Sequence, residues 1–260
     1  MISVVIPTNR PGGLEHAKAS LAAQTFQDFE VLVGSPFDPS FGRWVLDDFK
    51  GGFWSLNRIY DRLFAEAKGE LIVSLQDFTW IRPDGLARFW GLHERTRGAI
   101  AGVGDVYERV GLDGSHGQPS LIDYRRDRLW TSPVPLGSDS LGKDARRLLH
   151  PALQEWHWAA MPRDAIVGVG GMDQEMDFIG YSFDNVSAVE RMAERGLPFS
   201  IDYGNEAYCQ RHGRAPGWEK NCMGWDLYKS RKEELQGSGN WPVLATSSRA
   251  PSAHRGGPWT

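Results

Sequence analysis

The sequence predicts an α/β fold with a mainly parallel central sheet flanked by helices. The first observation is a short apolar run at residues 2–6 that is closed by Pro7, as is typical of a strand buried on both faces. The second is a helical stripe over residues 14–24, followed by another apolar run at residues 29–33. Strand, helix and strand in this order form a β-α-β unit, and such a unit places its strands in parallel.

The same alternation continues to about residue 110. Residues 56–67 carry apolar side chains at helical spacing, and Gly69 is expected to follow that helix as a left-handed cap before a strand over residues 70–75. Pro83 and Asp84 open a further helix that runs to about residue 97. Residues 99–110 then form one long strand or two. At 260 residues the chain has a length that suits one main domain.

The second half of the chain is less regular. Residues 111–150 mix turn residues with charges, which predicts loops and short strands. An ordered block follows, with a strand over residues 156–160, a short helix from Pro162, the glycine pair Gly170 and Gly171, and a helix over residues 184–195 that ends at Gly196. Residues 236–260 are rich in Ser, Gly, Pro and Arg and are expected to form a flexible or strap-like tail.

Composition narrows the class of protein. The 29 Lys and Arg residues against 33 Asp and Glu give a net charge of −4, which offers no overall attraction to nucleic acid or anionic membranes. The two cysteines, Cys209 and Cys222, make no disulfide framework and no zinc-type pair, so a reducing, cytoplasmic setting is expected. No window reaches the ~18 apolar residues of a membrane span.

Candidate site residues are sought just beyond the strands, because an open parallel sheet binds its ligands at the carboxyl ends of its strands. Three segments follow predicted strands, and a fourth region late in the chain contains a loop and the start of a helix. They contain Pro7, Thr8, Asn9 and Arg10 after the first strand, Asp38 after the second, Gln76 and Asp77 after the third, and Gly170, Gly171, Asp173 and Asp184 late in the chain. Hydroxyl, amide, guanidinium and carboxylate groups of this kind suit a nucleotide and a cation that bridges its phosphates.

An ordered set of motifs resembles the family 2 glycosyltransferases of GT-A fold. The matching segments are Ile2-Ser3-Val4-Val5-Ile6-Pro7-Thr8-Asn9-Arg10, Ala67-Lys68-Gly69-Glu70-Leu71-Ile72, Asp77 with Pro83-Asp84-Gly85-Leu86, and Gly170-Gly171-Met172-Asp173-Gln174-Glu175. The resemblance covers roughly residues 1–90 and 155–213. It implies a GT-A-like catalytic domain over residues 1–235, with a nucleotide-binding half at 1–110 and an acceptor-binding half at 111–235.

The resemblance also implies an activity, namely transfer of a sugar from a nucleoside diphosphate donor, with UDP-sugars favoured, to a hydroxyl acceptor with inversion. The acceptor class stays open between a glycan, a protein, a small molecule and a modified nucleobase. By this resemblance Asp184 is the general base at a helix start, and Asp173 lines the acceptor pocket. Thr8, Arg10 and Asp38 hold the nucleoside, with Pro7, Asn9, Gln76, Gly170 and Gly171 also on the donor side.

A divalent cation, Mn²⁺ or Mg²⁺, is implied by the same resemblance, with Asp77 in or beside the D-x-D position and His212 as an additional ligand. The chain departs from the family here, since Gln76-Asp77-Phe78 offers a single carboxylate. The acidic pair after the second strand is replaced by Gly34-Ser35, and the late helix begins with Asp184-Asn185 in place of an acidic pair.

Two other functions are compatible with the residues. The missing D-x-D carboxylate is compatible with an inactive relative that binds a nucleotide sugar or glycan without turnover. A nucleotidyltransferase has a similar layout, although Pro11-Gly12-Gly13 is a poor version of its glycine-rich first loop. Each candidate residue also has a purely structural alternative, such as helix capping for Asp184 or a turn for the glycine pair, and Trp156, His157 and Trp158 are either core residues or stacking surfaces.

Overall fold

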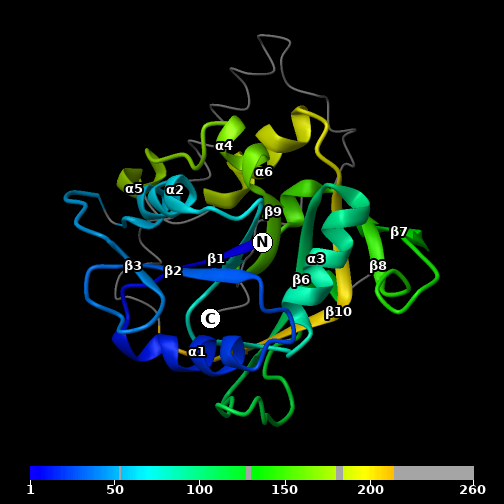
Figure 1. Ribbon diagram of the computed structural model, residues 1–260, viewed down its shortest axis with the longest axis horizontal. Helices are drawn as coiled ribbons and strands as arrows, with labels where there is room; N and C mark the ends of the chain where they lie inside the picture. The colour runs from blue at the N-terminus through cyan, green and yellow to red at the C-terminus, as the bar shows by residue number, and fades with distance from the viewer. Residues whose placement is uncertain (53, 127–129, 180–183, 214–260) are drawn as a thin grey trace.

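One twisted sheet forms the centre of the protein (Figure 1). The structure, a computed structural model, describes residues 1–52, 54–126, 130–179 and 184–213, with only the backbone of Ile179 and Asp184. Within these ranges ten strands join the sheet in the order β3-β2-β1-β4-β9-β6-β10-β8-β7, and β5 pairs with β10. None of the helices in the described ranges combines the length and the apolar character that crossing a bilayer would require.

The first four strands of the chain are parallel to one another. β1 (Ile2–Pro7) pairs with β2 (Phe29–Ser35) on one side and with β4 (Leu71–Leu75) on the other, and β3 (Arg43–Leu46) extends the sheet beyond β2. β9 (Trp158–Pro162) is antiparallel and lies between β4 and β6 (Ala99–Tyr107). β10 (Phe199–Gln210) is parallel to β6, and β5 (Thr79–Ile81), β8 (Ala145–Leu148) and β7 (Thr131–Pro135) complete the antiparallel part.

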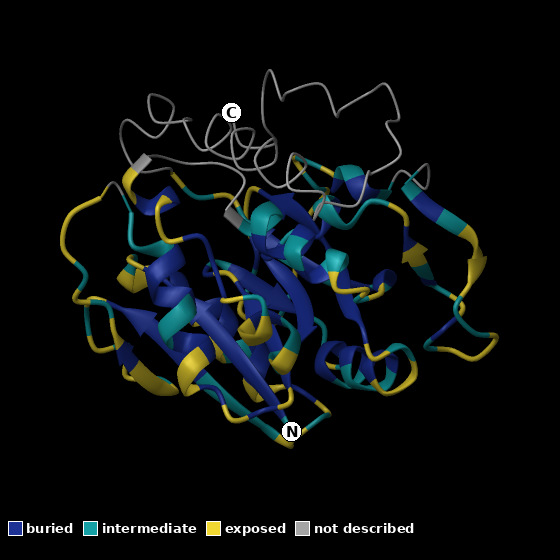
Figure 2. Cartoon of the chain, turned by 90° about the horizontal axis from the view of Figure 1, so that it is seen from above, coloured by how far each residue is buried: buried dark blue, intermediate teal, exposed yellow. Residues whose placement is uncertain are grey.

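Helices cover both faces of this sheet. α1 (Leu14–Ala22) and α3 (Gly85–Thr96) pack on the face that receives Ile2, Val4 and Ile6 from β1. α2 (Leu56–Glu66), α4 (Arg163–Gly168) and α6 (Asp184–Glu194) pack on the opposite face with Val5. Alternate side chains of one strand therefore enter two different cores, as the pleat of a strand requires. Figure 2 shows the central strands buried inside, with exposed residues on the loops, on parts of the helices and on the edge strands.

Several short helices connect the larger elements. The 3-10 turns span Pro11–Gly13, Tyr124–Arg126 and Pro151–Leu153, and α5 spans Met176–Ile179. The carboxylate of Asp177 in α5 accepts hydrogen bonds from the backbone N–H groups of Asn57 and Arg58, at 2.9 and 3.0 Å, in the first turn of α2. These groups have no partner inside their own helix, so α5 caps α2 from more than a hundred residues away.

The structure confirms the predicted α/β class and the predicted elements of the first half within one to three residues at their ends. β3, β5, α5 and β10 have no counterpart among the predicted elements. The expected left-handed cap at Gly69 is wrong, since Gly69 is not among the residues with positive φ. A Cβ at Gly69 would lie 2.5 Å from the backbone nitrogen of Ser3, so this glycine allows close approach to β1. The predicted tail at 236–260 lies outside the described residues.

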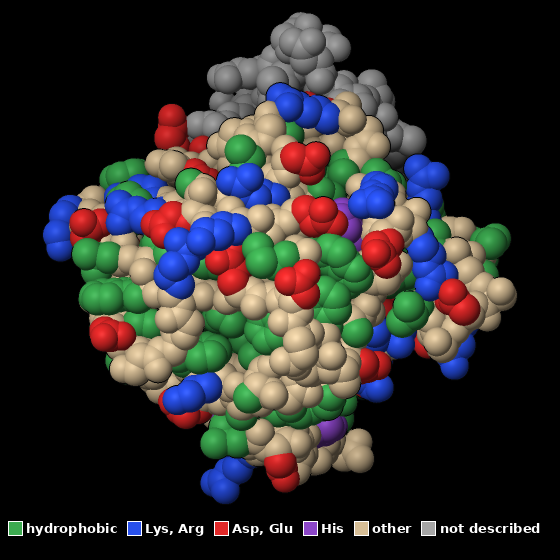
Figure 3. Space-filling model, in the orientation of Figure 1, with side chains coloured by type: hydrophobic (Ala, Val, Ile, Leu, Met, Phe, Trp, Pro, Cys, Tyr) green, Lys and Arg blue, Asp and Glu red, His purple; other side chains and the backbone are tan. Residues whose placement is uncertain are grey.

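Surface charge is mixed on the face drawn in Figure 3. Side chains of both signs lie intermingled across the upper half, while hydrophobic and uncharged atoms dominate the middle. No large region of one sign is visible on this face. This pattern agrees with the small net charge and gives that face no long-range attraction to a polyanion.

Gly102 in β6 is predicted to tolerate no side chain. A Cβ there would lie 2.1 Å from Cδ1 of Trp158 and 2.6 Å from the backbone oxygen of Asn205, both in the buried core. We expect Gly102→Ala to lower the free energy of unfolding by at least about 2 kcal/mol, because an overpacked core must shift its backbone. Urea denaturation measures this effect. Gly117→Ala is the control, since nothing lies within 4 Å of its Cβ, and equal stability of the two variants would contradict the packing described.

Candidate functional site

The order of the strands marks one position on the edge of the sheet. From β1 the chain moves outward through β2 and β3, and it then returns to β4 on the other side of β1. The carboxyl ends of β1 and β4 therefore form the point at which the strand order reverses. In open α/β sheets this is the place where a crevice forms and ligands bind. Thr8 continues β1 there, and Asp77 follows β4.

Asp77 is the centre of a polar cluster at this position, although its side chain is only 4% exposed. Oδ2 of Asp77 accepts hydrogen bonds from Oγ1 of Thr8 at 2.7 Å and from Nε of Arg10 at 2.9 Å. Oδ1 accepts a bond from Nη2 of Arg10 at 2.5 Å. This is a bidentate guanidinium–carboxylate pair, the strongest type of ion-pair hydrogen bonding, and it fastens the loop after β1 to the end of β4.

His212, two residues past the end of β10, closes the cluster. Its Nδ1 lies 2.6 Å from Nη1 of Arg10, on the side away from Asp77. The Phe78 ring packs against both groups. Its centroid lies 5.1 Å from the guanidinium carbon of Arg10 and 4.9 Å from the centroid of the His212 ring. Arg10 is therefore held by a carboxylate, an imidazole and an aromatic face. The structure thus brings together Thr8, Arg10, Asp77 and His212.

Two backbone features shape this cluster. Phe78 has φ +56°, a conformation that is unusual for a large side chain. Its N–H donates to the oxygen of Gly13 at 2.7 Å, and its oxygen accepts from the N–H of Gln210 at 2.8 Å. A Cβ on Gly13 would lie 2.7 Å from Cβ of Asp77, so only glycine permits this approach. The sequence alone indicates no role for Phe78 or Gly13.

The cluster does not fit a divalent cation as it stands. Asp77 and His212, the two expected ligands, lie on opposite sides of Arg10, and both carboxylate oxygens already accept hydrogen bonds. A permanent guanidinium charge between them repels a second cation. Nowhere in the described ranges do three or more His, Cys, Asp or Glu side chains form a group that could hold a metal ion.

The other residues expected on the donor side lie around this cluster or apart from it. Pro7 is buried in β1, and Asn9 and Gln76 are exposed next to Thr8 and Asp77. Asp38 is exposed, and its carboxylate accepts from the backbone N–H of Ser40 at 2.8 Å, as in a local turn. Among the residues that the structure describes, no hydrogen bond or ion pair joins Asp38 to the cluster.

The glycine pair lies against helices. Gly170 and Gly171 have φ +86° and +73°, and a Cβ on Gly171 would lie 2.2 Å from Oδ1 of Asp61 in α2. Asp61 accepts from the N–H of Met172 at 2.6 Å, and Nη2 of Arg191 in α6 donates to the oxygen of Gly171 at 2.6 Å. The pair thus makes a tight turn that joins α2 and α6. Asp173, just beyond it, is buried.

Asp184 is the first residue of α6, and its side chain lies outside what the structure describes. The next residue, Asn185, donates from Nδ2 to the backbone oxygen of Gln154 at 2.7 Å. Three residues after Gln154, the oxygen of His157 accepts from the N–H of Gln76 at 3.1 Å. The start of α6 and the end of β4 therefore both contact the short segment 154–157.

A second ionic network, which the sequence did not reveal, borders this edge. Asp123 binds Arg125 through both carboxylate oxygens, at 3.0 and 2.6 Å, and Arg125 donates from Nη2 to Nε2 of His157 at 3.1 Å. Asp105 in β6 pairs with Arg126 at 2.8 Å. All but Arg126 are buried. Residues 123–126 belong to the stretch predicted as loops and short strands, and their partners on β6 and at His157, just before β9, turn them inward.

Burial and neighbouring charge fix the protonation of this network. Burial, with the Arg125 guanidinium beside it, lowers the pKa of His157 to about 4, so the ring is neutral and accepts the bond from Arg125. Burial alone would raise the pKa of Asp123, but the charge and hydrogen bonds of Arg125 outweigh it and lower the pKa to about 2. Trp156, His157 and Trp158 are all buried, as their core interpretation predicted.

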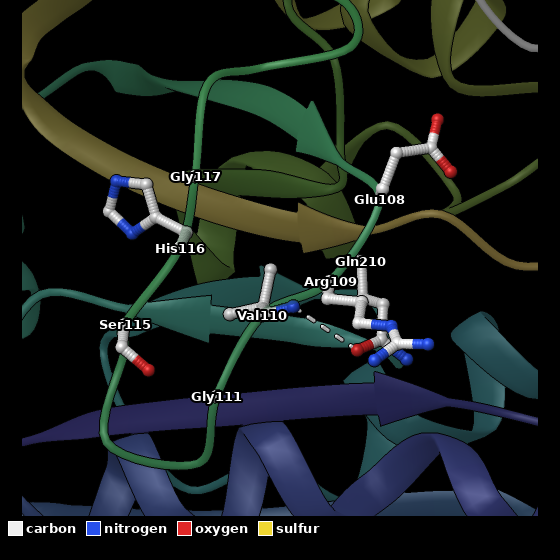
Figure 4. A pocket seen from close by; sticks show the side chains of 8 residues that line it. All are labelled: Glu108, Arg109, Val110, Gly111, Ser115, His116, Gly117 and Gln210. Carbon is white, nitrogen blue, oxygen red and sulfur yellow. Dashed lines mark hydrogen bonds between the residues drawn. The ribbon is translucent and has the colours of Figure 1, made fainter.

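A pocket of about 690 Å³ lies beside the cluster, at the carboxyl ends of β6 and β10 (Figure 4). Its lining comes from the loop after β6 and the last residue of β10. The lining residues are Glu108, Arg109, Val110, Gly111, Ser115, His116, Gly117 and Gln210. The dashed line in Figure 4 marks the bond from the N–H of Val110 to Oε1 of Gln210, at 3.2 Å.

Comparison with solved structures gives the class of fold. The chain matches a Staphylococcus aureus TarS fragment, residues 1–349, with a TM-score of 0.53 and 11% identity over 81% of this chain and 60% of that one. The same fragment with UDP-GlcNAc matches with a TM-score of 0.55 and 13% identity, over 82% of this chain and 59% of that one. GalNAc-T7 with UDP, GalNAc and Mn²⁺ matches with a TM-score of 0.57 and 13% identity, over 84% of this chain and 45% of that one.

The protein therefore has the GT-A-like glycosyltransferase fold that its sequence motifs suggested. It spans less than two thirds of the length of these structures. The sequence matches no protein-family model, and a search of curated proteins likewise finds no match.

The His157 network predicts that the protein loses stability in mild acid. The pKa of His157 is 6.5 unfolded and about 4 folded, so the unfolded chain binds more protons as the pH falls through this window. The resulting loss reaches roughly 3 kcal/mol at pH 4, and the low pKa of Asp123 adds a further loss between pH 3.8 and about 2.

Urea denaturation between pH 7 and pH 4 measures this dependence. In His157→Gln the group that titrates is absent, so the slope of stability against pH should become smaller in this window. His116→Gln changes an exposed histidine and serves as the control. An unchanged slope in His157→Gln would show that His157 is not the group responsible.

Proposed function

We propose that the protein is an inverting glycosyltransferase that moves a sugar from a nucleoside diphosphate sugar to a hydroxyl group of an acceptor. The observation that carries this proposal is the cluster of Thr8, Arg10, Asp77 and His212 at the strand-order reversal of a GT-A-like sheet. Four polar side chains from three separate segments meet there. A purely structural ion pair needs neither the topological position nor the additional hydroxyl and imidazole.

A UDP-sugar is the favoured donor. Two of the matching structures contain UDP or UDP-GlcNAc, and this chain shares their fold. In this proposal Arg10 faces the diphosphate and Thr8 supports it by its hydrogen bond to Asp77. Asn9 and Gln76 are exposed at the same strand ends, where the nucleoside would lie. Pro7 fixes the direction of the chain as it leaves β1, and Asp38 is the candidate for a ribose contact.

The chemical step needs a base on the acceptor side. Asp184 would take the proton of the acceptor hydroxyl as that oxygen attacks the anomeric carbon, while the bond from this carbon to the diphosphate breaks. The start of a helix favours an ionised carboxylate, which a general base requires. Asp173 would line the acceptor pocket, and the turn at Gly170 and Gly171 would shape its wall. Attack from the side opposite the leaving diphosphate inverts the anomeric carbon.

Asp184→Asn is expected to slow turnover strongly and to leave donor binding intact. The amide cannot accept the acceptor proton, so release of nucleoside diphosphate should fall by at least about 100-fold, the usual contribution of a general base. The assay incubates the protein with UDP-, GDP- and dTDP-sugars and a panel of glycan, peptide, small-molecule and nucleobase acceptors. It measures the nucleoside diphosphate that is released.

Asp164→Asn is the matched control, because Asp164 is also an acid in the first turn of a helix, but it is exposed in α4. Its activity should equal that of the unchanged protein. Full activity of Asp184→Asn would remove the assignment of the base. If the unchanged protein binds a nucleotide and never releases product with any acceptor, it is a binding protein of the same fold and the proposed activity is wrong.

A further inference from the structure

We infer that Arg10 takes the place of a divalent cation at the donor diphosphate, so that nucleotide binding in this protein does not require a metal. This inference rests on the proposed function and concerns the same site. It starts from the disagreement between the cation that the fold family uses and the residues found here. The two positions expected to hold the metal, Asp77 and His212, both contact the guanidinium of Arg10.

The hydrogen bonds of Arg10 leave it able to bind a phosphate. A guanidinium carries five N–H donors. Among the described residues Nε–H and one Nη2–H bind Asp77, and one Nη1–H faces Nδ1 of His212, which uses three of the five. Two N–H donors are left, one on each Nη. The side chain is 37% exposed, so these donors can reach a ligand at the edge of the sheet.

The charge of the cluster favours the same conclusion. Asp77 carries one negative charge and Arg10 one positive charge, so the pair is neutral before any ligand arrives. A carboxylate without that partner would attract a cation, but here the guanidinium already neutralises it at hydrogen-bond distance. A diphosphate that docks against Arg10 meets the outward N–H donors of a planar fork, a geometry that suits phosphate oxygens.

The position of the guanidinium is fixed in advance. Nε and Nη2 are anchored on a buried carboxylate, and the Phe78 ring lies against the guanidinium face. Phe78 is itself held in its left-handed conformation by backbone bonds to Gly13 and Gln210. Charge that is positioned before the reaction stabilises a developing negative charge without reorganisation, and the leaving diphosphate develops such a charge. This is the function that a bound cation would otherwise provide.

The test measures the binding of UDP, GDP and dTDP to the full chain by isothermal titration calorimetry, in EDTA and in Mn²⁺. With the nucleotide that binds best, we expect the two dissociation constants to agree within about twofold. Arg10→Ala should weaken binding by roughly 10- to 100-fold in EDTA, the loss expected for charge-assisted hydrogen bonds. Arg10→Lys keeps the charge without the planar fork, so its affinity for the nucleotide should lie between that of the unchanged protein and that of Arg10→Ala.

Arg95→Ala is the matched control. Arg95 lies on α3, its side chain is similarly exposed, at 32%, and it pairs with Asp139 at 2.7 Å. Its nucleotide binding should not change. Binding that appears only with Mn²⁺ would overturn the inference and leave the proposed function standing. Absence of binding by all three nucleotides in both conditions would overturn both. The comparison of EDTA with Mn²⁺ uses the unchanged protein, so it stays decisive even where Arg10→Ala fails to fold.

Discussion

The ion pair between Asp77 and Arg10 determines the structure around the site. The carboxylate of Asp77 is only 4% exposed and requires a charged partner, because an unpaired buried charge costs several kcal/mol. Arg10 supplies that partner with two parallel hydrogen bonds, and Thr8 adds a third. The loop after β1 is therefore tied to the end of β4 across the point at which the strand order reverses.

Several local features follow from this constraint. The loop can approach Asp77 only because residue 13 is a glycine, and Phe78 must turn into a left-handed conformation so that the chain can reverse into β5. β5 then pairs with β10, whose extension carries His212 to the free side of Arg10. A β-strand from the end of the described chain thus completes a site that begins in the first ten residues.

The network of Asp123, Arg125 and His157 organises the neighbouring part of the sheet edge, again through a buried carboxylate paired with a guanidinium. Arg125 is buried between Asp123 and His157, and this arrangement holds residues 123–125 against His157, which directly precedes β9. His157 stays neutral, so it accepts a hydrogen bond and adds no charge to the interior. Its backbone oxygen also binds Gln76, which links the network to the residue before Asp77.

The sequence by itself determined the α/β class, the strands and helices of the first half, and the segments from which the site is built. Those follow from local periodicity and from the rule that ligands bind at strand ends. β10 was missed because Asp202 and Asn205 interrupt its apolar pattern, and they are buried only through Arg88 and Trp158 on other elements. The pairing of Arg10 with Asp77 joins residues 67 positions apart. Only the tertiary structure decides such a contact, because its energy depends on burial and long-range geometry that no local pattern encodes.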